Sequence, residues 1–401
     1  MKTLRQKTGA VWPCVPLDQI ANINPRLSLT VGPNELVSFV PMAAVSAETA
    51  SIVEHQIRPY SEVSKGYTTF NKDDVLVAKI TPCFENGKIA QANITERLGF
   101  GSSEFHVIRP LPNKLDARYA LHFLRLDQVR VAGARRMTGS AGQRRVPENF
   151  IAKLEIPLPP LPEQRRIADI LDRADALRTL RRQALAELDG LTQSIFLDMF
   201  GDPATNPKGW PILKIADLLT SASYGTSEKA GQEGEYPILR MNNITRTGEI
   251  DCTDLKYITL EKNKERFLVE RGDVLFNRTN SPDLVGKTAI YRRAEVMAFA
   301  GYLIRLRVNE KADPEYLAAY LNMPYAKKIL RGMCKTIIGM ANINATEIQS
   351  MAIPLPDLKL QKEYASATGA IVNLKTTHVT YLNELSYLFA SLQHRAFRGE
   401  L

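Results

Sequence analysis

The chain has 401 residues, and this length exceeds what one ordinary hydrophobic core can organise, so we predict two or more domains. Its hydrophobic content of 44% is typical of a globular protein. Its formal net charge of +9 favours a polyanionic partner, since Lys and Arg side chains attract phosphates. No apolar run reaches the roughly 18 residues of a membrane span, and no apolar stretch follows the basic N-terminus. A membrane protein and a protein with a signal peptide are therefore not expected.

Four cysteines are scattered along the chain and form no Cys-x-x-Cys pair. Zinc sites and disulfide frameworks need closer spacing or a higher density of cysteine. We therefore expect reduced thiols in a cytoplasmic protein.

Residues 1–155 are predicted to form a first mixed α/β domain. The segment 74–80 has the pattern of a short buried strand, and 104–109 alternates like a second strand. Residues 115–132 have a helical pattern, and the polar, glycine-containing segment 138–148 is typical of a loop.

A proline-rich strap and a long helix are predicted for residues 156–200. Four prolines between Pro157 and Pro162 disfavour a helix there and favour an extended polyproline conformation. Between Ile167 and Ile195 apolar residues recur about every 3.5 residues, the period of a coiled-coil seam, with one slip at Leu180.

A Gly- and Pro-rich linker then opens a second domain, residues 201–352, and a second strap and helix occupy residues 353–401. Apolar residues from Ile371 to Leu392 step by three and four without a slip, and His378 in this stripe is expected to be buried. Two helices with complementary stripes most simply pack on each other, and pseudo-two-fold symmetry would make the pair antiparallel.

The two halves of the chain repeat each other. The sequence Ile-Pro-Leu-Pro at 156–159 recurs 197 residues later at 353–356. Other matches keep this offset within two residues, and they are Trp12 with Trp210, Asp74 with Asp273, Gly87 with Gly286, Asp116 with Asp313, and Gly142 with Gly339. A collinear series predicts an α+β fold in which two mixed α/β domains share one scaffold and differ on their surfaces. Approximate two-fold symmetry suits duplex DNA.

No catalytic or nucleotide-binding motif is recognisable in the chain. Asn24-Pro25 and Asn206-Pro207 lack the second proline and the aromatic residue of an amino-methyltransferase motif. Gly286-Lys287-Thr288 resembles the end of a P-loop, but Ser281 stands where its first glycine would be. The five histidines have no grouping typical of a metal site or a catalytic triad. The pattern indicates a binding protein.

Two pairs of polar loops are the candidate DNA-binding sites, because each combines cations with turn residues. The first pair follows a predicted strand and repeats in both halves; its candidates are Lys79, Thr81 and Lys88, with Arg278, Thr279, Asn280 and Lys287. In the second pair, glycines would let backbone N–H groups approach phosphates, while Gln and Arg can read base edges. Its candidates are Arg135, Arg136, Ser140, Gln143, Arg144 and Arg145, with Lys335, Asn342 and Asn344. The alternatives are solvated hairpin ends for the first pair and a salt-bridged surface loop for the second, although few acidic residues lie near the first member of the second pair in sequence.

A third basic region is the arginine run of the first long helix, from Arg165 to Arg182. Interspersed aspartates favour a solvated face with local ion pairs, and contact with DNA or with a partner subunit is the alternative.

The whole chain resembles the DNA specificity subunits of type I restriction–modification systems. The resemblance is carried by the strap at 156–168, the heptad helix after it, the segment Phe200-Gly-Asp-Pro through Trp210-Pro211, and the terminal Ala-Phe-Arg-Gly-Glu-Leu at 396–401. One departure is that Asp357 and Lys359 stand where the first strap has Pro160 and Pro162, which suggests a more flexible second strap.

The resemblance implies two target recognition domains, each reading one half of a bipartite, asymmetric site in double-stranded DNA. It places the polar turn 138–145 near DNA and implies no catalysis by this chain. Two methyltransferase subunits and the restriction subunits would be its partners. S-adenosylmethionine, ATP and Mg would then bind those partners, and no cofactor is expected on this chain.

The predicted helices set a distance between the two readers. About 35 residues at ~1.5 Å rise span roughly 50 Å, which suggests half-sites on the order of 12–15 base pairs apart. Two alternatives stay open at this point: a self-contained DNA methyltransferase or nuclease, and a coiled-coil scaffold that binds only proteins.

Overall fold

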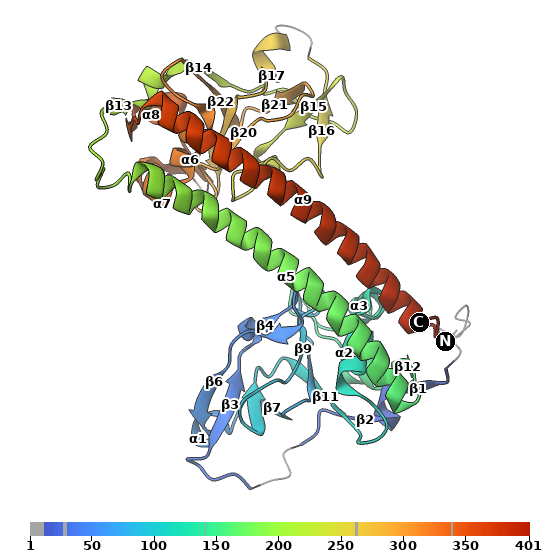
Figure 1. Cartoon of the computed structure of the whole chain (residues 1–401). Helices are drawn as coiled ribbons and strands as arrows, with labels where there is room; N and C mark the ends of the chain where they lie inside the picture. The colour runs from blue at the N-terminus through green and yellow to red at the C-terminus, as the bar shows by residue number, and fades with distance from the viewer. Residues whose placement is uncertain (1–11, 27–29, 141, 261–263, 338–339) are drawn as a thin grey trace. The chain divides into compact units, whose positions relative to one another are not determined.

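The computed structural model describes residues 12–26, 30–140, 142–260, 264–337 and 340–401 (Figure 1). The chain divides into two compact units, and each contains one half of each long helix. Unit 1 comprises Met1–Arg182 and Thr380–Leu401, and unit 2 comprises Gln183–Val379. The sequence predicts each strap and long helix as a segment separate from the domains. In the structure, each long helix instead contributes one part to unit 1 and the other part to unit 2.

Unit 1 is built on two four-stranded sheets. The first has the order β2-β11-β8-β9, with all neighbours antiparallel, and consists of β2 (Ala21–Ile23), β11 (Phe105–Pro110), β8 (Val75–Ala78) and β9 (Ile89–Gln91). The second has the order β6-β3-β10-β7, with only β3 and β10 parallel, and consists of β6 (Gln56–Pro59), β3 (Leu36–Val40), β10 (Leu98–Gly101) and β7 (Thr68–Asn71). The strands predicted at 74–80 and 104–109 are confirmed as β8 and β11.

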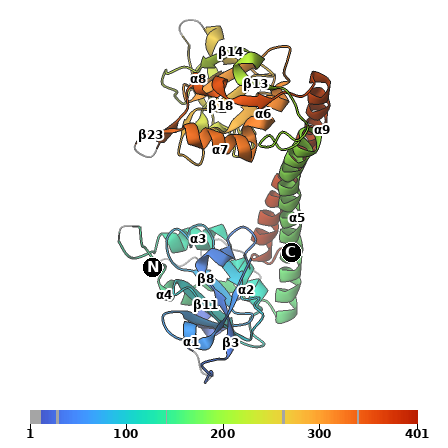
Figure 2. The ribbon, with the colours of Figure 1, turned by 90° about the vertical axis from the view of Figure 1, so that its left-hand side faces the viewer.

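Three short helices complete this domain: α2 (Ala117–Leu124), α3 (Asp127–Ala134) and α4 (Glu148–Ala152). The predicted helix at 115–132 is thus two helices, separated at Arg125 and Leu126. Figure 2 shows α2 between β8 and the long helix α5 (Leu161–Phe200). Its apolar residues belong to one core with β8 and with Ile167 and Leu171 of α5. The domain core therefore extends onto the first half of α5.

Unit 2 repeats this architecture. Its first sheet has the order β14-β22-β18-β20 and consists of β14 (Leu219–Tyr224), β22 (Leu303–Val308), β18 (Val274–Asn277) and β20 (Thr288–Ile290). Its second sheet has the order β16-β15-β21-β17, again with one parallel pair, β15 and β21, and consists of β16 (Lys256–Ile258), β15 (Tyr236–Leu239), β21 (Met297–Phe299) and β17 (Leu268–Val269). Helices α6 (Pro314–Asn322) and α7 (Pro324–Met333) correspond to α2 and α3.

The fold is α+β, with two mixed domains in a pseudo-two-fold repeat, as predicted. Each domain is closed at its base by a two-stranded antiparallel pair. In unit 1 this pair is β1 (Cys14–Pro16) with β12 (Glu155–Pro157), and in unit 2 it is β13 (Ile212–Lys214) with β25 (Ala352–Pro354). The strap prediction needs one correction, because α5 already begins at Leu161 and includes Pro162. Proline is tolerated in the first turn, where its missing N–H would have no partner in the helix.

The halves of α5 and α9 (Leu358–Ala396) run antiparallel in each unit. In unit 1 Arg178 Nε donates to Ser386 Oγ at 3.4 Å, and the Arg181 guanidinium lies over the Tyr381 ring. In unit 2 Lys375 Nζ lies 2.6 Å from Asp189 Oδ1, and Phe196 packs edge-on against Tyr364. In both units the contact partner on α9 moves toward the N-terminus as the residue on α5 moves toward the C-terminus, so the two helices are antiparallel.

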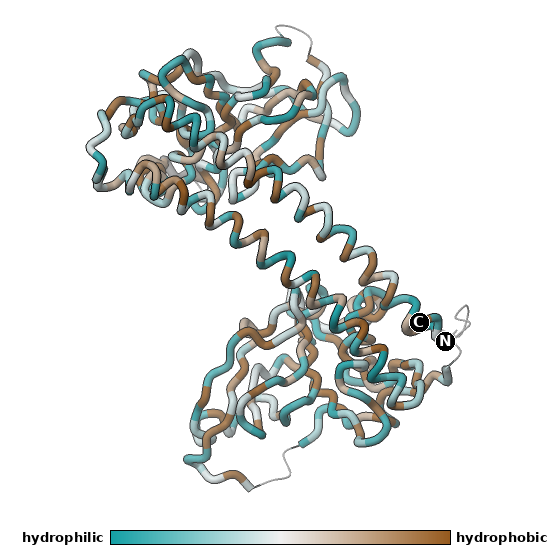
Figure 3. The backbone as a smooth tube through the Cα atoms, in the orientation of Figure 1, coloured by the Kyte–Doolittle hydropathy of each residue, from teal (hydrophilic) through white to brown (hydrophobic). Residues whose placement is uncertain are grey.

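The heptad stripes are less buried than a coiled-coil seam implies. Leu177 is 53%, Leu180 60% and Leu388 50% exposed, and apolar residues recur along both helices in Figure 3. His378, which the stripe predicts to be buried, is only half-buried. The buried helix residues instead face the domains, because burial in a domain core removes more apolar surface from water than contact with one other helix.

Candidate nucleic-acid interface

In unit 1 the two predicted loops, far apart in sequence, lie side by side. Ile80 and Thr138 each form a β-bridge with Arg145. Thr81 N donates to Arg144 O at 2.9 Å, and Val146 N donates to Lys79 O at 2.8 Å. We call residues 79–88 and 135–145 together surface 1. Hydrogen bonds between the two backbones fix the side chains of both loops on one rigid frame.

The turn of surface 1 needs glycine for its backbone. Gly139 has φ of +121° and Gly142 has φ of +81°, both in the left-handed region. A Cβ on Gly139 would lie 2.7 Å from the carbonyl oxygen of Gln143. The tight turn leaves Ser140 and Gln143 exposed at its tip. Their polar groups are therefore available to a ligand.

Two arginines of this turn are paired with carboxylates, which agrees with the salt-bridged alternative for those two residues. Arg145 forms a two-pronged pair with Glu104, with Nη2–Oε1 at 2.8 Å and Nε–Oε2 at 2.9 Å. Arg144 Nη2 lies 3.3 Å from Glu85 Oε1. The hydrogen bond from Arg145 lowers the pKa of the Glu104 carboxyl, which keeps the pair charged. Both acids are distant in sequence, which is why local sequence did not reveal them.

The other cations of surface 1 are freer. Arg135 and Arg136 are exposed at the end of α3, and no carboxylate of the described residues lies within 4 Å of either guanidinium. Arg136 stacks over the Phe150 ring at 5.2 Å. Thr81 Oγ1 donates to Glu85 at 3.0 Å, and Lys79 is half-buried. Arg135, Arg136, Ser140 and Gln143 are thus exposed on this surface, together with Asn86, Thr138 and the paired Arg144.

Unit 2 brings its two loops together in the same way. Strand β19 (Thr279–Asn280) pairs with β24 (Met340–Asn342), which pairs with β23 (Lys335–Ile337). Ile343 N donates to Arg278 O at 2.9 Å, which repeats the bond between Val146 and Lys79. We call residues 278–287 and 335–344 together surface 2. Gly339 and the side chain of Lys335 lie outside the described part of the structure.

Surface 2 differs from surface 1 in its chemistry. Arg278 stacks over the Tyr224 ring at 4.9 Å and donates to Gly301 O at 3.4 Å. Thr279 Oγ1 donates to Asn342 Oδ1 at 3.3 Å, and Asn342 is exposed. Asn280 Oδ1 accepts from Ser281 N at 2.9 Å, which leaves its amide nitrogen available. Surface 2 therefore contains a single arginine, whereas surface 1 contains four, and the other polar side chains of surface 2 are mainly amides and hydroxyls.

Some predicted site residues have a structural use instead. Asn344 caps α8 (Ala345–Ser350) by accepting from Glu347 N at 2.8 Å. Lys88 Nζ donates to Met42 O at 3.0 Å, and Lys287 Nζ donates to Met241 O at 2.8 Å. Burial lowers the pKa of Lys287, with a further contribution from Arg246. The recurrence of this lysine therefore has a structural explanation, and DNA contact by these three residues stays a prediction.

Two arginines of the run on α5 form local ion pairs, as the ion-pair interpretation predicted: Arg166 with Glu163 and Arg178 with Asp175, each at 2.7 Å. Its aspartates also bind residues of the domain: Arg118 Nη1 lies 2.7 Å from Asp169 Oδ1 and 2.9 Å from Asp172 Oδ2. No local sequence pattern had pointed to Arg118 as a partner of these aspartates. Tyr224 and Tyr302 were also missed; Tyr302, 49% exposed, directly precedes β22 beside Arg278. The one sequence signal that could have identified Tyr302 is its position in a loop between two strands.

Within the described ranges, no group of three or more His, Cys, Asp or Glu side chains could hold a metal ion. Among the same residues, no helix is long and apolar enough to cross a membrane.

The chain is similar to known proteins over most of its length. The family model for the type I restriction modification DNA specificity domain matches residues 12–189 and again 207–386. The specificity subunits of the type I restriction enzymes EcoEI and EcoAI of Escherichia coli are each 38% identical over 186 residues, or 46% of this chain and 31% of the relative. The match to this chain therefore covers less than a third of the length of those two relatives. The EcoKI specificity subunit of E. coli strain K12 is 26% identical over 79% of this chain and 72% of its own.

Two solved structures share the fold. The crystal structure of a type I restriction-modification S subunit from M. genitalium has a TM-score of 0.56 at 16% identity, covering 98% of both chains. A chain from a structure concerned with complex assembly and conformational transition of the type I R-M system has a TM-score of 0.54 at 20% identity. It covers 97% of this chain and 98% of its own.

Proposed function

This chain belongs to the type I restriction modification DNA specificity family, and from that premise we propose that it is a non-catalytic subunit that reads a bipartite, asymmetric site in duplex DNA. The observation that carries the proposal is the meeting of two polar loops on one surface in each unit. Two equivalent surfaces with different side chains would read two different half-sites. The three E. coli relatives and the M. genitalium protein are themselves named specificity or S subunits, which supports neither of the two alternatives.

The side chains of the two surfaces suggest how each half-site is read. Arginine can donate two hydrogen bonds to guanine O6 and N7, whereas Asn and Gln can bond bidentately to adenine. Surface 1 offers Arg135, Arg136 and Gln143, and surface 2 offers Asn280 and Asn342. Lys and Arg contacts to phosphates would supply most of the affinity without sequence preference.

Methyltransferase and restriction subunits are the proposed protein partners. The half-exposed leucines of the long helices, such as Leu177, Leu180 and Leu388, offer apolar surface for docking them. S-adenosylmethionine, ATP and Mg would bind those subunits, and this chain would supply only DNA contacts and docking surfaces.

Long-read methylation sequencing of the host, with and without this gene, tests the proposal. The expected result is a methylated motif with two short specified parts and an unspecified spacer, absent when the gene is removed. A single short continuous motif that depends on the gene would contradict the bipartite interpretation. No gene-dependent methylation, together with no salt-dependent duplex binding by the subunit complex, would contradict DNA recognition itself.

A further inference from the structure

Unit 1 contains a cavity of about 290 Å³, which shares Phe84, Asn86, Gly87 and Lys88 with surface 1 and is otherwise lined by residues outside it. It is bounded by the turn at Gly87-Lys88, by Arg130 of α3, by Arg178 and Arg182 of α5, and by Ser386 of α9. All of these residues belong to the same compact unit. The cavity is therefore a feature of one folded body.

The cavity is lined by more positive than negative charge. Its five cations are Lys88, Arg125, Arg130, Arg178 and Arg182, and its two lining carboxylates are Glu48 and Asp127. A third carboxylate, Asp175, is shared, at 2.6 Å from Arg125 and 2.7 Å from Arg178. The side chains of Glu48 and Asp127 are 62% and 84% exposed, so water screens their charge more than that of the less exposed guanidinium groups. An excess of two positive charges therefore remains.

One guanidinium nitrogen in the cavity has no acceptor. Arg182 Nε lies 2.7 Å from Glu48 Oε1, but its Nη1 is buried without a hydrogen-bond partner among the described residues. A buried unsatisfied donor of a charged group is costly. The pKa of Arg178 is lowered, first by burial and then by the like charges of Arg182 and Arg125. An anion in the cavity would relieve both effects.

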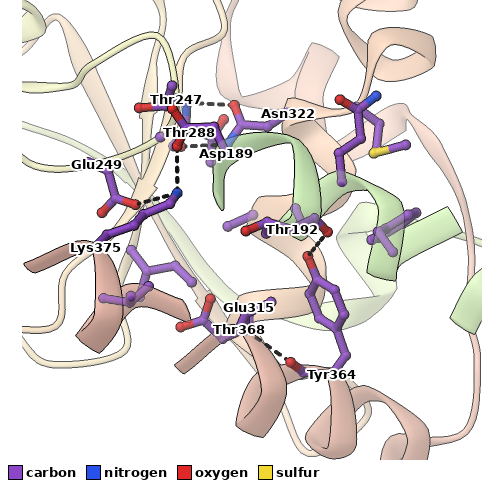
Figure 4. Close-up of a pocket in the computed structure, with 18 of the residues that line it drawn as sticks. Asp189, Thr192, Thr247, Glu249, Thr288, Glu315, Asn322, Tyr364, Thr368 and Lys375 are labelled. Atoms are coloured by element: carbon purple, nitrogen blue, oxygen red, sulfur yellow. Dashed lines mark hydrogen bonds and ion pairs between the residues drawn. The ribbon is translucent and has the colours of Figure 1, made fainter. Parts of the chain in front are cut away.

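The equivalent cavity of unit 2 provides an internal comparison. It has about 340 Å³ and balanced charge, with the cations Arg246, Arg292 and Lys375 and the carboxylates Asp189, Glu249 and Glu315. Lys375 repeats Arg178 after 197 residues, and Ser386 stands 197 residues after Asp189. Figure 4 shows Lys375 reaching toward Glu249, and its Nζ lies 3.7 Å from that carboxylate and 2.6 Å from Asp189. At this repeated position unit 2 has the carboxylate of Asp189 and unit 1 has the hydroxyl of Ser386, and the carboxylate that pairs with Arg178 is instead Asp175 of the same helix.

We propose that the cavity of unit 1 binds a phosphate group, with Arg182 Nη1 and Arg130 as donors. Ser386 permits this binding because it is uncharged, whereas a carboxylate at its position would repel the phosphate. Guanidinium groups suit this ligand, because their planar N–H donors match the oxygen spacing of phosphate. The phosphate could come from a free anion or from a DNA backbone. The free-anion case does not depend on the proposed DNA-reading function.

Three variants of the full chain test the site. Arg182→Gln removes the unpaired donor, and Ser386→Asp installs the carboxylate that unit 2 has at the repeated position. Arg246→Gln is the matched control, because Arg246 is an exposed arginine lining the balanced cavity. Thermal unfolding of each variant verifies that the fold is retained.

Calorimetric titration with inorganic phosphate tests the free anion. We expect saturable binding of one phosphate, weakened about tenfold by Arg182→Gln, abolished by Ser386→Asp and unchanged by Arg246→Gln. Binding to a duplex of arbitrary sequence at several salt concentrations tests the DNA source. In that case Arg182→Gln and Ser386→Asp reduce the slope of log affinity against log salt by about one, and Arg246→Gln leaves it unchanged.

Either pattern supports the site and identifies its ligand. The proposal is overturned if folded Arg182→Gln and Ser386→Asp proteins match the wild type in both titrations, or if Arg246→Gln has the same effect as Arg182→Gln. Phosphate binding without any duplex binding would keep this site and would count against the DNA-reading function.

Discussion

Gln164 and Gln361, 197 residues apart, make the same three hydrogen bonds at the start of the two long helices. Gln164 Oε1 accepts from Asp116 N at 2.8 Å, and its Nε2 donates to the carbonyls of Lys114 and Pro159. Gln361 Oε1 accepts from Asp313 N at 2.8 Å, and its Nε2 donates to Lys311 and Pro356. Both side chains are fully buried. Each glutamine ties a strap and a helix to its domain.

Replacing either glutamine by leucine should destabilise the protein by about 2–4 kcal/mol, because three backbone groups lose their buried partner. Urea unfolding of Gln164→Leu and Gln361→Leu measures this loss. Gln143→Ala, at an exposed position, is the control and should be nearly neutral. A small effect of Gln361→Leu alone would show that the second strap, with fewer prolines, is held less firmly than the first.

Lys287 should matter for stability and not for DNA affinity. Its Nζ donates to Met241 O and Ile244 O, so Lys287→Met leaves two carbonyls without their donor and should cost about 1–3 kcal/mol. Lys79→Met is the comparison, because Lys79 belongs to surface 1. It should lower the salt dependence of DNA binding by about one phosphate, with little change in stability. If Lys287→Met instead lowered the salt dependence of DNA binding without loss of stability, Lys287 would belong to the DNA interface.

Lys327 should make the stability of unit 2 depend on pH. Burial, followed by repulsion from Arg331 and Lys287, lowers its pKa to about 7. The unfolded chain, with a lysine pKa of about 10.4, then binds more protons than the folded one between these values, so stability rises with pH across that window. Lys327→Met should remove this rise. Because the residue is partly exposed, we expect a difference on the order of 1 kcal/mol between neutral and alkaline urea unfolding.

In the Lys327 experiment Lys328→Met is the matched control, because the neighbouring lysine is exposed. Its unfolding should keep the pH dependence of the wild type. If the Lys327→Met protein keeps it too, Lys327 is charged in the folded protein.

Single amide truncations should affect only one half of the DNA site. Asn342→Ala removes an exposed amide from surface 2, and Gln143→Ala removes one from surface 1. A lost base contact costs about 1–3 kcal/mol and relaxes the preference at that position. Methylation sequencing of each variant should show a changed base in one part of the motif and an unchanged other part. A change in both parts from one substitution would contradict separate reading by the two surfaces.

The repeat, the α+β class and both long helices could be predicted from sequence, because local patterns determine them. The shared anchors proved to be structural: Asp74 pairs with Arg109, and Asp273 with Arg307, at the same place in the two domains. The carboxylate of each pair is buried, so it needs the arginine beside it in both copies. The heptad period likewise predicted the two long helices. Which face of each helix is buried, however, depends on the domain that packs against it.

The sequence by itself determined a duplicated scaffold with polar, basic loops between its anchors. Only the tertiary structure decided which loops form one surface, because the backbone bonds that join residues 79–81 to 144–146 connect segments with no local signal for each other. It also decided which cations are free. Arg145 is held by Glu104 and Lys287 by two carbonyls, and these partners lie 41 to 46 residues away in the chain. The sequence shows which residues are charged, but whether a charge is neutralised depends on its distance to a partner, and only the folded structure determines that distance.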